Sequence, residues 1–586
     1  MPKAQRKRQR KPQPDERKIL RKIRKQMPSH GVEIALQATA EQSVTLQRVQ
    51  EHLRVIRNTV LGELKKWYDQ MVRTKTYQRV MRQYRKIYEK LEKTTDKKQM
   101  AVLDVEIKTL HDLLNGMREQ YQVTFDHARQ YGEMLHATKF SLPDSVTVWS
   151  ACEMAWHSVE GLLFRNAEKV YFYKRDDFMT LQGKQAERSV IVKYDEKHHA
   201  WIVQHHGIMF PLMVKPDDLF IEEILSNIEH YREHAKEIDQ RNRVLYQAKQ
   251  PLIPTYRIRN NRIVTRVIRG KPRYFLQMVL EGKPVAKRKK DGTFRHTYGT
   301  GRIGADLGTQ SLGVVTDEQV ILKNLAERSE NSLDRERTLA HLQRYLDRSK
   351  RATNPQNFDE KGRIKKGRKT WRFSTRYFKA KAKRKELHRK AEVNRKLAHN
   401  EDINRLRSYG DALYIEPMQF KSLQQKAKEV KKDEKTSRWT RRKRFGKSIQ
   451  HRSPGYFFSR VKQVFHDTGG QVYEVHNITF AASQYDHMLD EKHKKTLNQR
   501  WHELPDGRRI QRDLYSAFLL YCADETLKHP DRTLCQDHFE GFYLLHNACV
   551  EEIRRTHKRI LNSGIAVHAD HDKHVRRKYR RRKTIA

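Results

Sequence analysis

Three acidic residues in the second half of the chain stand where a carboxylate could do chemistry. Asp306 lies within the apolar run RIGADLGTQSLGVVTD, where burying a charge is costly unless a cation binds it. Glu416 ends the apolar stretch GDALYIEPMQF, so a sheet edge would present its carboxylate. Asp513 falls in the first turn of an expected helix, where it could also merely complement the helix dipole. The glycines around the first acid are expected to let its strand turn tightly and reverse: Gly304, Gly308 and Gly313.

Together these carboxylates indicate metal-dependent phosphodiester chemistry. Three acids brought together by a sheet repel one another unless divalent cations hold them. Two Mg²⁺ ions, for which Mn²⁺ could substitute, would activate a water for in-line attack on a phosphodiester and stabilise the leaving oxygen. We therefore predict that Asp306, Glu416 and Asp513 are both catalytic and metal-binding residues.

The charge of the chain predicts a polyanionic partner. Its 586 residues include 122 lysines and arginines against 71 acidic residues, a formal net charge of +51. Such an excess would bind nucleic acid tightly and lose affinity steeply with salt. Composition alone fits a ribosome-associated or chromatin-like packing protein equally well. No apolar run approaches the roughly 20 residues of a membrane helix, and the N-terminus lacks the apolar core of a signal peptide, so we expect a cytoplasmic protein with no membrane partner.

The elements that must position these residues change in type along the chain. A basic, proline-punctuated arm at 1–30 is expected to be extended or partly disordered, either gripping a phosphate backbone or solvated as a tail. Apolar residues at three- and four-residue steps predict a helical bundle within 31–160. Alternating β-branched and aromatic residues predict a β-rich domain at 161–300, with a helical stretch near 218–248. Strands and helices then mix, as in an α/β layer fold.

Cysteine usage argues against both a disulfide framework and a cysteine zinc site. The chain contains no C-x-x-C pair, and its four cysteines are scattered: Cys152, Cys522, Cys535 and Cys549. Free cysteine commonly packs in cores, so we expect buried reduced thiols.

Basic segments add candidate nucleic-acid contacts. The stretch SRWTRRKRFGKSIQHRSP at 437–454 interleaves aromatic and basic residues, which can hold a backbone by charge and stack a base or ribose. The tail at 574–583, HVRRKYRRRK, is expected to be a flexible nonspecific clamp. The individual contacts that we predict are Arg441, Arg442, Lys443, Arg444, Arg500 and Arg512.

The motifs, taken in order, resemble a known family. GADLGTQSLGVV, LQRYLDRSKRATNP, ALYIEPMQF, GGQVYEVHN and IQRDLYSAF are similar in order and spacing to the RuvC domain of the TnpB transposon-encoded nucleases and their type V CRISPR effector relatives. The resemblance covers about 300–525. It implies that Asp306, Glu416 and Asp513 are the family's three metal-binding catalytic carboxylates.

The same resemblance implies a multidomain α+β protein. A helical recognition lobe and a β-barrel-like wedge domain would precede an RNase H-like (RuvC) α/β nuclease domain. The implied parts are a basic N-terminal arm at 1–30, the recognition lobe at 31–160, the wedge domain at 161–300, the first nuclease part at 301–478, a target-loading module at 479–510, and the last nuclease part with its basic tail at 511–586.

The chain departs from the family in the target-loading module. Family members usually carry two C-x-x-C pairs there, which form a zinc ribbon, whereas this chain has no cysteine between Glu416 and Asp513. We therefore predict a module without zinc. The family's Asp two positions before the last carboxylate is Gln511 here. Four histidines could bind zinc in principle but are expected, as surface residues, to bind nothing: His476, His487, His493 and His502.

The function that the resemblance implies is RNA-guided DNA cleavage. Such a bacterial, cytoplasmic endonuclease would carry one guide RNA per protein and cut target double-stranded DNA with a single Mg²⁺-dependent RuvC site. Two alternatives stay open. One is a guide-dependent DNA-binding repressor that no longer cuts, which the loss of a carboxylate would mark, although all three are present here. The other, less favoured, is a transposase of RNase H-like fold.

Overall fold

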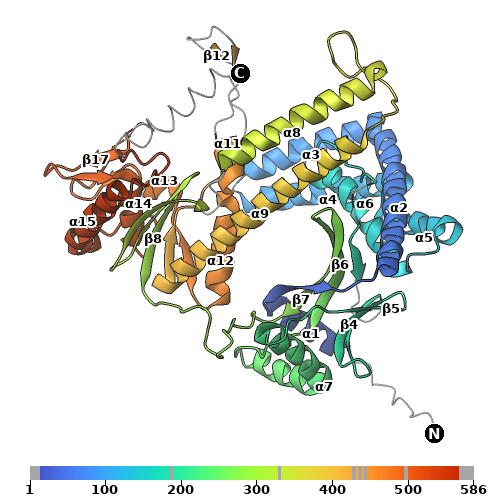
Figure 1. Cartoon of the computed structure of the whole chain (residues 1–586), viewed down its shortest axis with the longest axis horizontal. Coiled ribbons are helices and arrows are strands. Elements are labelled where there is room, and N and C mark those ends of the chain that lie inside the picture. Colours follow the sequence, from blue (N-terminus) through green and yellow to red (C-terminus); the bar gives the residue numbers. More distant parts are fainter. Residues whose placement is uncertain are drawn as a thin grey trace. The chain divides into compact units, whose positions relative to one another are not determined.

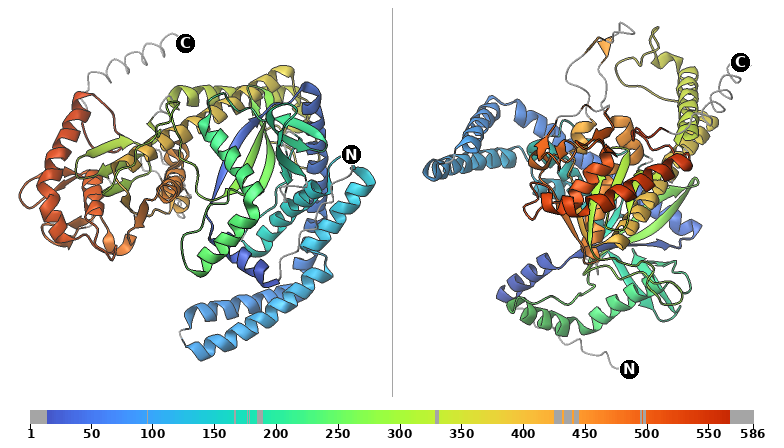
Figure 2. Two further views of the ribbon diagram at one scale, coloured as in Figure 1. Left: turned by 90° about the horizontal axis from the view of Figure 1, so that it is seen from below. Right: turned by 90° about the vertical axis from the view of Figure 1, so that its left-hand side faces the viewer.

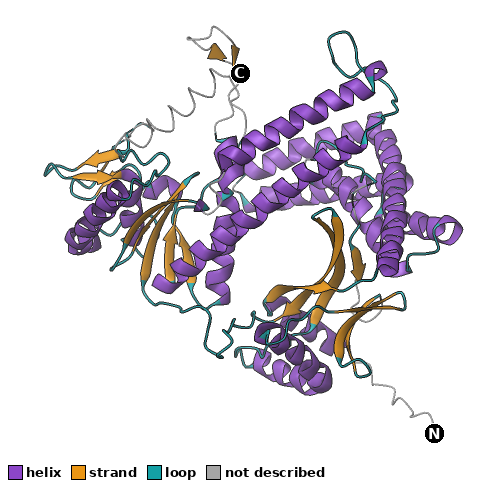
Figure 3. Ribbon diagram, viewed as in Figure 1, coloured by secondary structure: helices purple, strands orange, loops and turns teal. Residues whose placement is uncertain are grey.

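The chain is a mixed α+β protein that divides into two compact units, Met1–Thr293 and Phe294–Ala586 (Figures 1 and 3). No helix in the described residues is both long and apolar enough to cross a membrane. The computed structural model describes residues 14–94, 96–165, 167–175, 177, 179–183, 189–327, 332–424, 431–432, 439–440, 445–493, 496 and 499–566.

The predicted helical bundle forms in the first unit. Its helices are α2 (Ala40–Arg73), α3 (Lys75–Lys93), α4 (Lys97–Gln120), α5 (Phe125–Lys139) and α6 (Ser145–Phe164). Thr39 starts α2 with a capping box, in which its hydroxyl accepts from the Gln42 N–H and the Gln42 side chain accepts from the Thr39 N–H. Helices α3 and α4 pair as a hairpin that projects from the bundle, as both views of Figure 2 show.

Two open antiparallel sheets complete the first unit. One has the order β1 (Ser29–Leu36), β7 (Lys271–Glu281), β6 (Ile258–Ile268) and β2 (Leu181–Gly183). The other contains β3 (Val190–Asp195), β4 (Ala200–His205) and β5 (Ile208–Pro211), followed by helix α7 (Leu219–Gln247).

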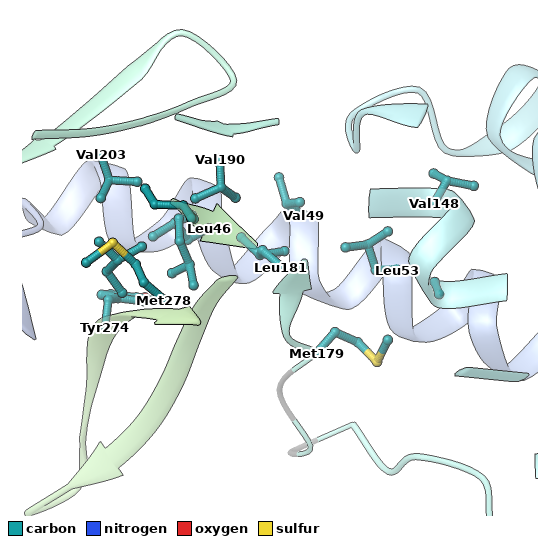
Figure 4. Packing of buried hydrophobic residues seen from close by; sticks show 14 of the residues in the cluster. Leu46, Val49, Leu53, Val148, Met179, Leu181, Val190, Val203, Tyr274 and Met278 are labelled. Atoms are coloured by element: carbon teal, nitrogen blue, oxygen red, sulfur yellow. The ribbon is translucent and has the colours of Figure 1, made fainter. Parts of the chain in front are cut away.

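These described strands do not close into a barrel, so the expected barrel-like domain is corrected to two sheets around a shared core. The sheets are separate hydrogen-bonded sets, and an isolated bridge between Leu36 and Leu212 links the end of β1 to the chain after β5. Figure 4 shows the core between them, where Leu46 of α2 packs among Met278 of β7 and Val203 of β4.

The segment after residue 13 differs from the expected extended arm. Residues Pro14–Gln26 form helix α1, and β1 pairs with β7 along its whole length, so residues 31–36 also belong to a sheet rather than to the helical lobe. Leu20, Ile23 and Met27 are buried. Their helical spacing is a short apolar stripe that the many basic residues around it obscured in the sequence. Residues 1–13 lie outside the described part of the chain.

The second unit is built on a mixed sheet with the order β10 (Val320–Asn324), β9 (Ser311–Val315), β8 (Arg302–Leu307), β11 (Ala412–Ile415) and β14 (Gln471–Glu474). The first three strands are antiparallel, and β11 runs parallel to both β8 and β14. This combination of strands and helices is the α/β layering that the sequence predicted after residue 300.

Helices cover both faces of this sheet. Buried residues of α9 (Thr375–Tyr409) and α12 (Pro454–Asp467) share a core with Ile303, Ala305 and Leu307 of β8. On the opposite face, α14 (Arg512–Tyr521) and α15 (Arg532–Arg555) share a second core with Val315. A further helix, α8 (Ser332–Thr353), packs beside α9 (Figure 1).

Short elements connect these layers. They are the 3₁₀ turn η2 (Pro355–Asn357), α10 (Phe420–Leu423), β12 (Lys431–Lys432), β13 (Trp439–Thr440), α11 (Gly446–Arg452), α13 (Asn477–Phe480), β15 (Tyr485–Asp486), β16 (Glu491–Lys492), β17 (Trp501–Glu503) and β18 (Arg509–Gln511). The cysteines are free, as predicted: Cys152, Cys522 and Cys535 are buried and Cys549 is half-buried.

Candidate active site

Strand register places two of the three predicted carboxylates side by side. In the parallel pair of β8 and β11, Ala305 lies opposite Ile415, so the next residues along the two strands are Asp306 and Glu416. Side chains alternate between the faces of a sheet. Because Ala305 and Ile415 belong to the core beneath α9 and α12, Asp306 and Glu416 are directed to the opposite face, where α14 packs.

Helix α14 brings the third carboxylate to this face through two glycines. A Cβ at Gly304 would overlap the carbonyl oxygen of Ala517, and a Cβ at Gly313 would lie 2.8 Å from the carbonyl oxygen of Asp513. These glycines therefore serve the close approach of a helix backbone, not the strand reversal that we expected of them. The reversal is made at Gly308, whose N–H donates to the carbonyl oxygen of Ser311 at 3.0 Å.

The start of α14 is capped by Gln511, which frees Asp513 from that task. The Gln511 Oε1 accepts the N–H of Leu514 at 2.8 Å, and its Nε2 donates to the carbonyl oxygen of Ser563 at 3.2 Å. Its backbone N–H donates to Nε2 of His546 at 2.9 Å. Gln511 is fully buried, so these bonds fix the first turn from which Asp513 projects.

The electrostatics show that the three carboxylates lie close to one another. Burial raises the pKa of Asp306 well above its usual range, and the charges of Asp513 and Glu416 raise it further against the opposing charge of Arg512. Burial also raises the pKa of Glu416. Burial is again the largest effect at Asp513, whose pKa is raised although Arg512 and Arg500 oppose the shift. The charges of the other two acids thus act on Asp306, and all three acids are partly buried; their binding of metal and their role in catalysis stay predictions.

The chemistry of this donor set suits a hard divalent cation. Carboxylate oxygens are the ligands that Mg²⁺ prefers, and Ser311 adds a hydroxyl whose Oγ lies 3.4 Å from Oδ2 of Asp513. In the described residues, no three His, Cys, Asp or Glu side chains are grouped tightly enough to make a complete metal site. The three acids therefore do not form a complete metal site in this structure, although the pKa of Asp306 shows that a nearby cation would favour its ionised form.

Two of the predicted nucleic-acid contacts lie beside these acids. Arg512 donates from Nη1 to the carbonyl oxygens of Thr496 and Gln499, both at 3.3 Å, and its Nε lies 3.9 Å from Oδ1 of Asp513. Burial, and then the charge of Arg512, lower the pKa of Arg500. Their contact with nucleic acid stays a prediction. The other predicted contacts, Arg441, Arg442, Lys443 and Arg444, lie outside the described residues.

The histidines of the predicted zinc-free module do not all lie at the surface. His476 and His493 are exposed, but His487 and His502 are buried, which corrects our expectation. His502 donates from Nε2 to Oδ2 of Asp486 at 2.9 Å, and the Tyr515 hydroxyl hydrogen-bonds Nδ1 of His487 at 2.7 Å. The hydrogen bonds to Asp486 and Tyr515 offset the cost of removing the nitrogen atoms of these two rings from water.

This network is joined to the helix that carries Asp513. The aromatic ring of His502 stacks on that of Tyr515, with 4.9 Å between ring centroids, and Tyr515 also accepts the backbone N–H of His487 at 3.1 Å. Although burial alone would raise the pKa of Asp486, hydrogen bonds from His502 and from the Met488 N–H hold it below its usual value. The module is thus held to α14 by hydrogen bonds and stacking.

Two buried histidines lead us to expect that the second unit loses stability in mild acid, because their burial disfavours the protonated form. Burial lowers the pKa of His487, and of His399, a buried residue of α9, to about 4 each. The stability that their neutral forms contribute is complete above the unfolded-state pKa of about 6.5 and is lost as the pH falls towards 4. We expect about 2 kcal/mol of lost stability per histidine at pH 5, seen as a lower urea midpoint than at pH 7.

The variant His487→Gln is the control for this effect, because its side chain cannot titrate. Its midpoint should change less between the two pH values than that of the wild type. An equal change in both proteins would contradict the assignment of the pH dependence to His487.

Comparison with known proteins gives no relative on which to rest a family assignment: no protein-family model matches the chain, and no curated protein matches it. The sequence had pointed to the three carboxylates but not to Ser311, to the cap at Gln511 or to the buried network around Tyr515. The partners of Ser311 and Tyr515 are distant in the chain, and Gln511 caps an N–H only three residues on but is not among the residue types that usually cap helices.

Proposed function

We propose that the chain is an RNA-guided DNA endonuclease that cuts at the site of Asp306, Glu416 and Asp513. The observation that supports this proposal is that the charges of Asp513 and Glu416, both far away in the sequence, raise the pKa of Asp306, together with the strand register that sets Asp306 beside Glu416. Buried like charges with raised pKa values are typical of catalytic and metal-binding sites. The net charge of +51 supports a nucleic-acid substrate.

The residues of the site have separate tasks in this proposal. Asp306, Glu416 and Asp513 would hold the metal through carboxylate oxygens, and the Ser311 hydroxyl would orient Asp513. Bound Mg²⁺, or Mn²⁺ in its place, would supply Lewis acidity for the activation of water and for the leaving oxygen. Arg500 and Arg512, beside Asp513, would draw the phosphate of the target strand towards the acids.

Sequence specificity would come from base pairing with a guide RNA. The chain would grip backbone and heteroduplex shape with its excess of lysine and arginine, to which Arg441, Arg442, Lys443 and Arg444 would contribute. We propose one guide RNA per chain, double-stranded DNA as the target and the bacterial cytoplasm as the compartment. The resemblance of the ordered motifs to TnpB and type V effectors supports this form of the proposal over an unguided nuclease.

The test is guided cleavage by the purified ribonucleoprotein. The chain is expressed beside its native flanking DNA, the RNA that copurifies is sequenced, and plasmids with and without the matching target are incubated with the complex in Mg²⁺. We expect one enriched structured RNA and cutting of the matched plasmid alone.

Other outcomes would count against the proposal. Absence of an enriched RNA would leave an unguided nuclease. A complex that binds the matched plasmid without cutting it would be a repressor, and joined rather than cut DNA would indicate a transposase.

A further inference from the structure

The segment that joins α8 to α9, together with the first turn of α9, carries a series of packed aromatic rings. Trp371 and Phe373 are nearly parallel, with ring centroids 6.4 Å apart, and Phe373 stacks on Tyr377 at 4.4 Å. Phe358 packs edge-on against Trp371 at 5.8 Å, and Phe378 packs edge-on against Phe373 at 5.9 Å. These five residues are called the aromatic ladder. None of them is buried, and Phe378 is 52% exposed.

Hydrogen bonds from two buried asparagines, Asn354 and Asn357, hold the backbone of the ladder in place. Asn354, which is fully buried, donates from Nδ2 to the carbonyl oxygens of Arg372 at 2.8 Å and Lys350 at 3.0 Å. Its Oδ1 accepts the N–H of Arg372 at 2.6 Å. Asn357 donates to the carbonyl oxygen of Thr370 at 2.6 Å. The backbone around Trp371 is therefore tied to the end of α8, which preorganises the rings.

Positive charge surrounds the ladder. The Lys350 Nζ lies 4.0 Å from the centre of the Trp371 ring, and the Arg351 guanidinium lies 6.0 Å from that of Phe358. Between residues 350 and 381 there are twelve lysines and arginines against two acids. One of these acids, Asp359, is paired with Arg363 at 3.8 Å. A binding partner for this surface must tolerate a dense cationic field.

Two explanations other than nucleic acid fit this surface less well. A small apolar core would bury its residues, whereas none of the five residues of the ladder is buried. A protein interface is usually depleted in lysine, but Lys361, Lys365, Lys366 and Lys369 all lie within this segment. Accessible rings among basic residues are what proteins use to stack unpaired bases while holding their phosphates. A duplex would offer phosphates but not base faces.

We propose that the aromatic ladder is a stacking platform for unpaired nucleotides, of RNA or of DNA, whose backbone is held by the surrounding lysines and arginines. The proposal deepens the proposed function, because it names how the chain would hold an unpaired segment of its guide or of a displaced DNA strand. Binding at the ladder needs neither metal nor cleavage, so it can be tested separately from the active site.

The test uses the full chain freed of nucleic acid, with EDTA present so that nothing is cut. Fluorescence anisotropy measures affinity for single-stranded RNA and DNA probes of about 12 nucleotides and for the matching duplex. The variants are Trp371→Leu/Phe373→Leu, which removes two rings, and Lys365→Gln/Lys366→Gln, which removes two charges. Leu544→Ala, at a site on α15 that is 71% exposed, is the control for the loss of an exposed apolar side chain.

Losing two rings should weaken single-strand binding by about tenfold or more and leave duplex binding and the salt slope nearly unchanged. Losing two lysines should instead lower the salt slope by about one to two for every probe. Asn354→Ala keeps all five rings but releases their scaffold, and it should share the selective single-strand loss. The control should bind like the wild type. A greater loss for RNA would assign the ladder to the guide, and a greater loss for DNA to a displaced strand.

Equal weakening of single-stranded and duplex probes by the ring variant would overturn the proposal, as would unchanged single-strand binding. If the ring variant has a lower melting temperature, the comparison rests on Phe378→Leu, which removes the 52% exposed ring and should still weaken single-strand binding selectively. Failure of guided cleavage would refute the proposed function and leave these affinities as they are.

Discussion

Asp306→Ala is expected to lower the rate of DNA cutting by at least about a thousandfold, which corresponds to about 4 kcal/mol of activation free energy. Asp306 is close to both other acids, because the charges of Asp513 and Glu416 each raise its pKa. In the proposed site, its loss would remove a metal ligand that lies near both of the other acids. Glu416→Ala and Asp513→Ala should also abolish cutting.

Binding of the matched target should survive these substitutions. Affinity would come from phosphate contacts and RNA–DNA pairing spread over the chain, to which one partly buried acid adds little. Cleavage rate and gel-shift affinity are measured on one target with the matched guide in Mg²⁺. Glu525→Ala, an exposed acid just beyond α14, is the control and should cut normally. Undiminished cutting by the three site variants would refute the assignment of the active site.

The same acids give a second measurement that does not depend on activity. Because the pKa of Asp306 is raised in the folded chain, its ionised form opposes folding above that pKa. Asp306→Asn should therefore raise the melting temperature without metal, by roughly 2–4 °C for each kcal/mol of repulsion relieved. Mg²⁺ should raise the melting temperature of the wild type and have little effect on this variant. A wild type that Mg²⁺ does not stabilise would contradict metal binding at these acids.

The sequence predicted those features of the site that depend on residues near one another in the chain, and not those that depend on distant residues. Apolar runs around Asp306 and Glu416 predicted strands, and apolar spacing after Asp513 predicted a helix. The pairing of Ala305 with Ile415 joins residues that are distant in the chain, so their adjacency could be expected only from the order of the motifs. Gly304 and Gly313 were visible in the sequence, but their role depends on a helix about two hundred residues further on.

Burial explains most of what sequence reasoning missed. His487 and His476 both lie among mixed polar and apolar residues in the sequence, yet His487 packs against Tyr515 and His476 stays at the surface. The stripe of Leu20, Ile23 and Met27 was too short to stand out from a basic segment, but α7 gives this part of the chain a surface to pack on. The ladder around Trp371 was missed because its scaffold is a side chain, Asn354, that bonds the backbone 18 residues away.

Gly304→Ala should destabilise the second unit by about 3 kcal/mol or more, which is at or above the usual range for overpacking a core. The new Cβ would overlap the carbonyl oxygen of Ala517 and crowd the backbone of Tyr521. These are backbone atoms of α14, so no side-chain rotation can relieve the overlap and the helix must move away from β8. Gly313→Ala should have a smaller effect, because its nearest neighbour, the carbonyl oxygen of Asp513, would lie 2.8 Å away.

The urea midpoint of the second unit and the cleavage rate are measured together for these variants. Gly541→Ala is the matched control, because Gly541 lies within α15 with no atom within 4 Å of its added Cβ. It should stabilise that helix by up to about 1 kcal/mol. In Gly304→Ala, cutting should fall even in the molecules that remain folded, because a displaced α14 takes Asp513 away from Asp306. A midpoint and rate equal to those of the wild type would mean that α14 does not contact β8, and the three acids would then have no structural reason to meet.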